Sequence, residues 1–168
     1  YRKAYDARVL SIMLPGAVVG VGVGWAAASV VPEDWVTVLV GVIGLAFALN
    51  LILRPRPDAP PRPARVVPGL FWGAAAGFTS FVSHAGAPPY QVYTMPLGLR
   101  KEVYAGTATI LFAWVNAVKL IPYFFLGQLN LANLHVAVLL MPVAAVAVLA
   151  GVRLVRILPE KLFFRLVT

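Results

Sequence analysis

The chain has 168 residues, of which 61% are hydrophobic and 12% charged, with a net charge of +8 and no cysteine. A soluble domain of this size cannot bury so much apolar surface, so lipid must be the solvent for part of the chain. Disulfides, thiolate metal sites and cysteine nucleophiles are excluded. The basic residues lie between apolar runs, a pattern typical of membrane orientation signals, so we expect no nucleic-acid partner.

Two apolar runs near the start of the chain are long enough to span a bilayer. The first, residues 9–31, contains Pro15 and several glycines that would let a neighbouring helix approach closely. Residues 35–53 form the second predicted span. Residues 54–68 contain six prolines and four arginines, so they can neither continue a helix nor enter hydrocarbon. We expect them to form an extended, solvated linker.

The second part of the chain begins with an apolar segment, residues 69–97, that is interrupted at residues 83–87 just before two prolines. This pattern predicts two short half-helices joined by a turn, the second beginning at Pro88 or Pro89. Further spans are predicted at residues 103–126 and 134–155, and the start of a last helix at 159–168. The predicted fold class is therefore all-α.

The basic residues also predict the topology. All but one of the 14 cations lie in four stretches, and the positive-inside rule places these in the cytoplasm: residues 1–8, 54–68, 98–102 and 153–165. If all four are cytoplasmic, residues 69–97 must enter and leave the membrane from the same face. We therefore expect a re-entrant pair of half-helices with its turn near mid-membrane. The alternative is a broken helix that crosses fully, which would place Arg100 and Lys101, or the C-terminal cations, outside.

An internal repeat occurs at an offset of 127 residues. The matched positions are Pro15, Gly24 and Pro32-Glu33 in the first copy, and Pro142, Gly151 and Pro159-Glu160 in the second. In the predicted topology the copies run in opposite directions, as inverted-topology repeats of secondary transporters do. We expect residues 1–53 to end a first repeat and residues 69–168 to form the second, within a longer protein of eight membrane elements.

Lys119 is the strongest single indication of a ligand site. It lies about 24 Å along the predicted helix from Val103, inside the apolar span, where a charged group costs at least ~2.5 kcal/mol. The predicted spans contain no acidic residue to pair with it, which favours an anionic ligand. Asn116, three residues earlier, shares its helix face. In the alternative interpretation, Lys119 reaches the outer headgroups through its flexible side chain.

The interruption at residues 83–87 is the second indication. Non-helical backbone at membrane depth is tolerated only where it is packed in protein or lines a wet cavity. A half-helix beginning near Pro89 would direct its free N–H groups at mid-membrane and could bind an anion. Two roles are equally open for His84: binding a ligand or a proton, or a structural role in which it bonds a carbonyl of the broken helix. The candidate substrate-binding residues are Ser80, Ser83, His84, Gly86, Pro88, Pro89, Gln91, Asn116 and Lys119.

The sequence contains none of the common catalytic motifs. It has no paired carboxylates, no Ser/His/Asp arrangement, no metal-ligand spacing and no nucleotide-binding loop. We expect neither catalysis nor a metal or cofactor.

Residues 77–129 resemble the second half of the TauE/SafE family of sulfite and organosulfonate exporters. The most specific motifs are the Gly/Pro-Pro break with its Leu-Gly-Leu-Arg-Lys loop, and the run Val115-Asn116-x-x-Lys119-x-x-Pro122-Tyr123. Ala85 and Ala87 stand where glycines are common in the family.

The resemblance implies a multi-pass permease of the bacterial inner membrane with two inverted halves. Its substrate would be a small anion such as sulfite, a sulfonate or a carboxylate, and its other partner the lipid bilayer. A homodimer is a further expectation. The favoured function is anion export by alternating access; the alternatives are a non-transporting membrane scaffold or assembly subunit, and an anion channel.

Overall fold

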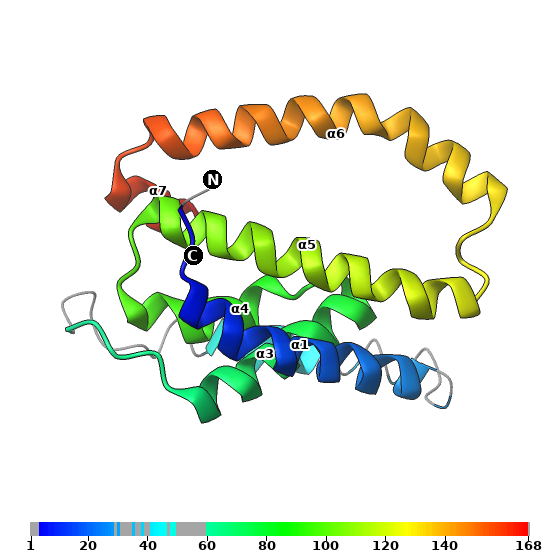
Figure 1. Cartoon of the computed structure of the whole chain (residues 1–168), viewed down its shortest axis with the longest axis horizontal. Coiled ribbons are helices and arrows are strands. Elements are labelled where there is room, and N and C mark those ends of the chain that lie inside the picture. The colour runs from blue at the N-terminus through cyan, green and yellow to red at the C-terminus, as the bar shows by residue number, and fades with distance from the viewer. Residues whose placement is uncertain are drawn as a thin grey trace.

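The computed structural model describes residues 4–28, 30, 35, 38, 41–46, 48–49 and 60–167. Residues 35, 38, 41–46 and 48–49 are helical, and the rest of the span predicted at residues 35–53 lies outside the described residues. The helices with defined bounds are α1 (Ala7–Ala28), α3 (Val66–Ser83), α4 (Ala87–Thr94), the 3-10 helix η1 (Met95–Leu97), α5 (Lys101–Phe125), α6 (Leu131–Ile157) and α7 (Glu160–Val167) (Figure 1). Because the described residues contain no strand, the all-α prediction is confirmed.

Four of these helices, α1, α3, α5 and α6, are long and apolar enough to cross a membrane. At 1.5 Å per residue, α5 and α6 are about 38 and 40 Å long, more than the roughly 30 Å of a hydrocarbon core. The chain is therefore a polytopic membrane protein. The expected spans at residues 9–31, 103–126 and 134–155 are present as α1, α5 and α6, with ends that differ by a few residues.

The α1 and α3 helices pack against each other through glycines. A Cβ on Gly20 of α1 would overlap the carbonyl oxygen of Ala74, and a Cβ on Gly77 of α3 would overlap that of Ala17. Backbone therefore lies directly against backbone, an approach that small residues allow between membrane helices. The core of the described structure lies where α1 and α3 meet the buried face of α5.

The two half-helices form a hairpin whose ends lie together. At its open end, the Arg62 amide donates a hydrogen bond to the Pro96 carbonyl (2.8 Å), and the Tyr93 hydroxyl donates to the Arg65 carbonyl (3.0 Å). The break at residues 84–86 is at the other end, in contact with α5 near Phe112, roughly 17 Å from the start of that helix.

The two arms therefore form a hairpin, as a re-entrant pair requires, although the first arm, α3, is itself long enough to cross a membrane. That the pair enters and leaves the membrane from the same face stays a prediction. The bounds differ from the expected ones at both arms. The first arm starts at Val66 instead of Gly69, because Pro68 lies in its first turn, where its missing N–H is not needed. The second arm starts at Ala87, ahead of both prolines.

The α6 helix runs along the outside of the bundle, beside α5 (Figure 1), and none of its residues is buried. A hollow of about 430 Å³, lined by Pro142, Val143, Val146 and Ala147, lies on its surface. Beyond α6 the chain turns back, and Phe163 of α7 packs edge-on against Tyr104 of α5, with ring centroids 6.0 Å apart.

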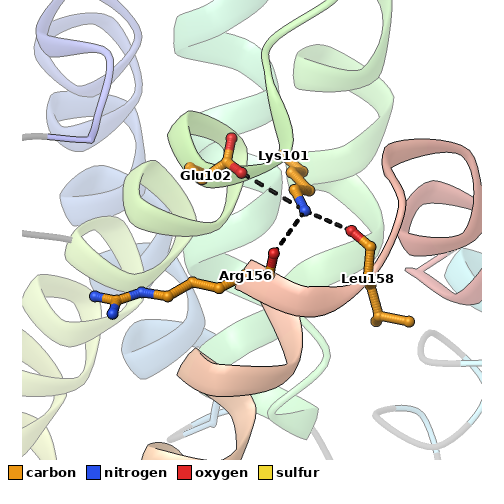
Figure 2. Close-up of polar contacts among 4 residues, drawn as sticks. All are labelled: Lys101, Glu102, Arg156 and Leu158. Atoms are coloured by element: carbon orange, nitrogen blue, oxygen red, sulfur yellow. Dashed lines mark hydrogen bonds and ion pairs between the residues drawn. The ribbon is translucent and has the colours of Figure 1, made fainter.

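One lysine connects the end of α6 to the start of α5. The Lys101 ammonium donates hydrogen bonds to the carbonyls of Arg156 (3.2 Å) and Leu158 and lies 3.6 Å from Glu102 (Figure 2). The last carbonyls of a helix have no partner within the helix and attract cations. Lys101 therefore stabilises the corner between α6 and α7.

Candidate functional site

Lys119 faces the interior because it continues the buried stripe of α5. The buried positions recur every three or four residues along this helix, at Tyr104, Thr107, Leu111, Val115 and Lys119. This spacing places them on a single face. The sequence therefore positions a cation where an apolar side chain would be expected.

The Lys119 side chain is directed at the end of the first half-helix. Its ammonium donates to the Ser80 carbonyl oxygen (2.9 Å) and to the Ser80 hydroxyl oxygen (3.2 Å). Lys119 is 2% exposed and Ser80 is 4% exposed. The ammonium thus points into the protein, and not toward the outer end of α5 as a headgroup-seeking lysine would.

Lys119 and Tyr123 together cap the C-terminal end of α3. The last four carbonyls of a helix lack intrahelical partners. Of these, the Ser80 carbonyl accepts from Lys119, and the Phe81 carbonyl accepts from the Tyr123 hydroxyl (3.4 Å). Since Lys119 and Tyr123 are four residues apart on α5, they lie one above the other on the same face. The positive charge also suits the negative end of the α3 dipole.

The turn of the hairpin begins at His84. Its backbone is left-handed (φ 56°), and its amide donates to the Thr79 carbonyl, which also accepts the Ala85 amide (3.2 Å) and the Ser83 hydroxyl (3.0 Å). The imidazole of His84 is exposed and stacks on Tyr123, with centroids 6.4 Å apart. A left-handed residue that ends a helix is usually glycine, so a histidine in this position could not be predicted from the sequence.

Gly86 allows the second half-helix to approach α5. It is buried, and a Cβ there would lie 2.6 Å from a ring carbon of Phe112 and 2.9 Å from the Ala76 carbonyl oxygen. A larger residue would push the turn away from α5.

The N-terminus of α4 offers fewer donors than the sequence suggested. Because the helix begins at Ala87, Pro88 and Pro89 occupy its second and third positions and supply no N–H groups. The Tyr90 amide is bonded to the Gly86 carbonyl (3.4 Å). In the first turn of α4, the backbone N–H that remains to bind an anion is therefore that of Ala87.

The other candidates lie in different surroundings. The Gln91 side-chain amide is buried and donates to the Val167 carbonyl of α7 (2.9 Å). Asn116 is exposed on α5. The structure thus brings Ser80 and Lys119 into contact, with Ser83, His84 and Gly86 in the adjoining turn. Tyr123 is not among the site residues predicted from the sequence; its spacing of four residues from Lys119 was the available signal.

Comparison with known protein families gives a match over residues 1–168 to the family described as sulfite exporter TauE/SafE. No curated protein and no solved structure matches the chain.

Proposed function

The chain belongs to the TauE/SafE family of sulfite exporters, and on that premise we propose that it exports sulfite or small organosulfonates by alternating access. The family is one of membrane transporters, so its members act on small anions within the lipid bilayer. We further propose that the protein lies in a bacterial inner membrane with its basic loops in the cytoplasm, as their distribution favours.

The observation that carries the proposed site is the buried charge of Lys119, which has no acidic partner among the described residues. The side chain is 2% exposed, yet the ion pair found among the described residues is the one between Lys101 and Glu102. A buried charge is costly unless it is paired. An anion bound beside Lys119 would supply the missing negative charge.

The hydrogen bonds of Lys119 to the described residues also leave one of its N–H donors for a ligand. An ammonium has three N–H donors, and the described contacts with Ser80 use two. The third is available to an oxygen of sulfite or of a sulfonate, which would accept a charge-assisted bond. We propose that Ser83, His84 and Gly86, with the helix start at Pro88 and Pro89, form the wall on the hairpin side.

Gln91 and Asn116 remain part of the proposal as residues that line the path. Gln91 lies on the same half-helix as Pro88 and Pro89, on the side of α7. Asn116 lies one turn before Lys119 on α5. Both carry amide donors that a sulfonate oxygen could accept from.

The test is anion transport in proteoliposomes, with sulfite, sulfoacetate, taurine, thiosulfate and simple carboxylates as substrates. Lys119→Met keeps the length of the side chain and removes its charge, so we expect transport of sulfonates to fall at least about thirtyfold. Lys161→Met, the same change at an exposed lysine of α7, is the matched control and should leave transport unchanged. Unaltered transport by a well-folded Lys119→Met protein would exclude the site.

A scaffold role is the second candidate, because capping the C-terminal end of α3 is by itself a structural role for Lys119. A scaffold would move none of the anions, even when the wild-type protein is correctly inserted. An anion channel would give an electrogenic current that does not saturate with concentration, whereas a transporter would saturate.

A further inference from the structure

The Tyr123 ring contacts two groups at the break, the buried Lys119 ammonium and the ring of the left-handed residue His84. The Lys119 nitrogen is 5.8 Å from the centroid of the Tyr123 ring. The same ring stacks on His84 and packs against Phe81 of α3, with centroids 5.4 Å apart. Its hydroxyl donates to the Phe81 carbonyl. Among the described residues, Tyr123 is the one aromatic side chain that lies under a lysine ammonium.

These contacts restrict a side chain that is otherwise free to move. Lysine carries its charge on a flexible four-carbon stem. The face of an aromatic ring attracts an ammonium electrostatically, and the attraction grows where water is excluded. With Ser80 on one side and the Tyr123 ring on the other, the ammonium is held at the end of α3.

The local chain geometry explains why Tyr123 can reach all three neighbours. It follows Lys119 by one helical turn, so it faces the last turn of α3. Pro122, buried beside it, removes one backbone N–H from the α5 ladder, which weakens the regular helix at this level. The aromatic ring thus occupies the junction of α3, α5 and the hairpin turn.

We infer that Tyr123 is a positioning residue for the anion site, one that holds the Lys119 ammonium and the His84 ring in the arrangement that receives the substrate. The inference depends on the proposed function, because it assigns Tyr123 a role in the site centred on Lys119. Tyr123 itself need not touch the anion.

Two other tyrosines make comparable hydroxyl bonds, and Tyr93 serves as the control for simple packing. Tyr93 also donates its hydroxyl to a carbonyl of the chain at the start of α3, that of Arg65 (3.0 Å), and is 6% exposed. Tyr90 donates to the Tyr104 carbonyl (2.9 Å). If Tyr123 acted through packing and its hydroxyl bond alone, substitutions at Tyr93 and Tyr123 would have the same kind of effect.

The experiment measures KM and kcat for sulfonate transport in proteoliposomes, together with the thermal shift that the sulfonate induces in detergent. The variants are Tyr123→Phe, Tyr123→Leu and Tyr93→Leu, with Lys119→Met as the reference for loss of the site. We expect Tyr123→Phe to stay within about threefold of wild type, because the ring remains. Tyr123→Leu should raise KM about tenfold and reduce the ligand-induced shift. Tyr93→Leu should lower the Tm and leave KM unchanged.

A further variant tests the ring electrostatics when Tyr123→Leu does not fold. Tyr123→pentafluorophenylalanine keeps the ring shape but removes the negative face, so KM should rise relative to Tyr123→Phe at equal Tm. A packing role would leave these two variants equal, which would overturn the inference.

The outcomes separate the inference from the proposed function. If Lys119→Met abolishes transport while Tyr123→Leu keeps the wild-type KM, the inference is wrong and the Lys119 site stands. If Lys119→Met transports normally, or the wild type moves none of the anions, the proposed site fails and the role of Tyr123 fails with it.

Discussion

The α1 and α6 helices occupy matching positions in the sequence repeat, yet their surroundings differ. Half of the most apolar stretch of α1 is buried, chiefly against α3, whereas none of the corresponding stretch of α6 is buried. The α1 contact depends on Gly16 and Gly20, and the matching positions of α6 are Val143 and Ala147.

The difference shows that apolar content does not decide which membrane helix is buried. Hydrocarbon solvates leucine and valine as well as a protein core does, so no hydrophobic force draws two such helices together. Close packing of small residues does so instead, because it lets the backbones meet. The glycines distinguish α1 from α6 where hydropathy does not.

The strongest test of this comparison is Gly20→Leu. Its side chain would meet the backbone at Ala74, and backbone cannot move aside cheaply, so we expect a loss of about 3 kcal/mol or more. Size-exclusion profiles and Tm in detergent would measure it. Gly151→Leu, on α6, has open space around its Cβ and is the matched control. Equal losses at the two sites would refute the contrast.

A smaller effect is expected from the hydrogen bond that ties the start of α1 to α5. The Asp6 amide donates to the Thr107 hydroxyl oxygen (2.9 Å), and Thr107 is fully buried. Thr107→Val leaves that amide without an acceptor, which should cost about 1–3 kcal/mol. Thr109→Val removes a similar hydroxyl that bonds only its own helix at an exposed position, and should change stability by less than about 0.5 kcal/mol. Thermal or denaturant unfolding would compare them.

The smallest effect should come from the lysine that holds the end of α6. Lys101→Met removes the donor to the Arg156 and Leu158 carbonyls, a loss of about 1 kcal/mol. Because the effect is local, hydrogen exchange of amides in the last turn of α6 should become faster while that of α1 stays the same. Lys161→Met is the control. No change in α6 exchange would show that lipid alone fixes the helix.

The sequence allowed much of the fold to be predicted. Apolar run lengths gave α1, α5 and α6, and the paired prolines after a polar turn located the break. The positions of the cations indicated that both arms of the hairpin share one end. The division into two inverted repeats stays a prediction.

The site was harder to predict, because it depends on how deeply the hairpin enters the bundle as well as on the order of the helices along the chain. Lys119 and Ser80 meet only because the last turn of α3 lies level with the second half of α5, and no local pattern states how far a hairpin penetrates. The bond from Gln91 to Val167 likewise requires the return of α7 along the bundle. His84 in a left-handed conformation contradicted the usual preference for glycine.

The capping of α3 by side chains of α5 has a mechanical consequence. Because Lys119 and Tyr123 of α5 hold the C-terminal end of α3, the two helices cannot slide past each other without exposing the Ser80 and Phe81 carbonyls to hydrocarbon. We therefore expect α5 and the hairpin to move as one rigid body during a transport cycle. The hinges would then lie outside this pair, at the loops that lead into it and away from it. Spin labels on α3 and α5 should keep a constant separation with and without substrate.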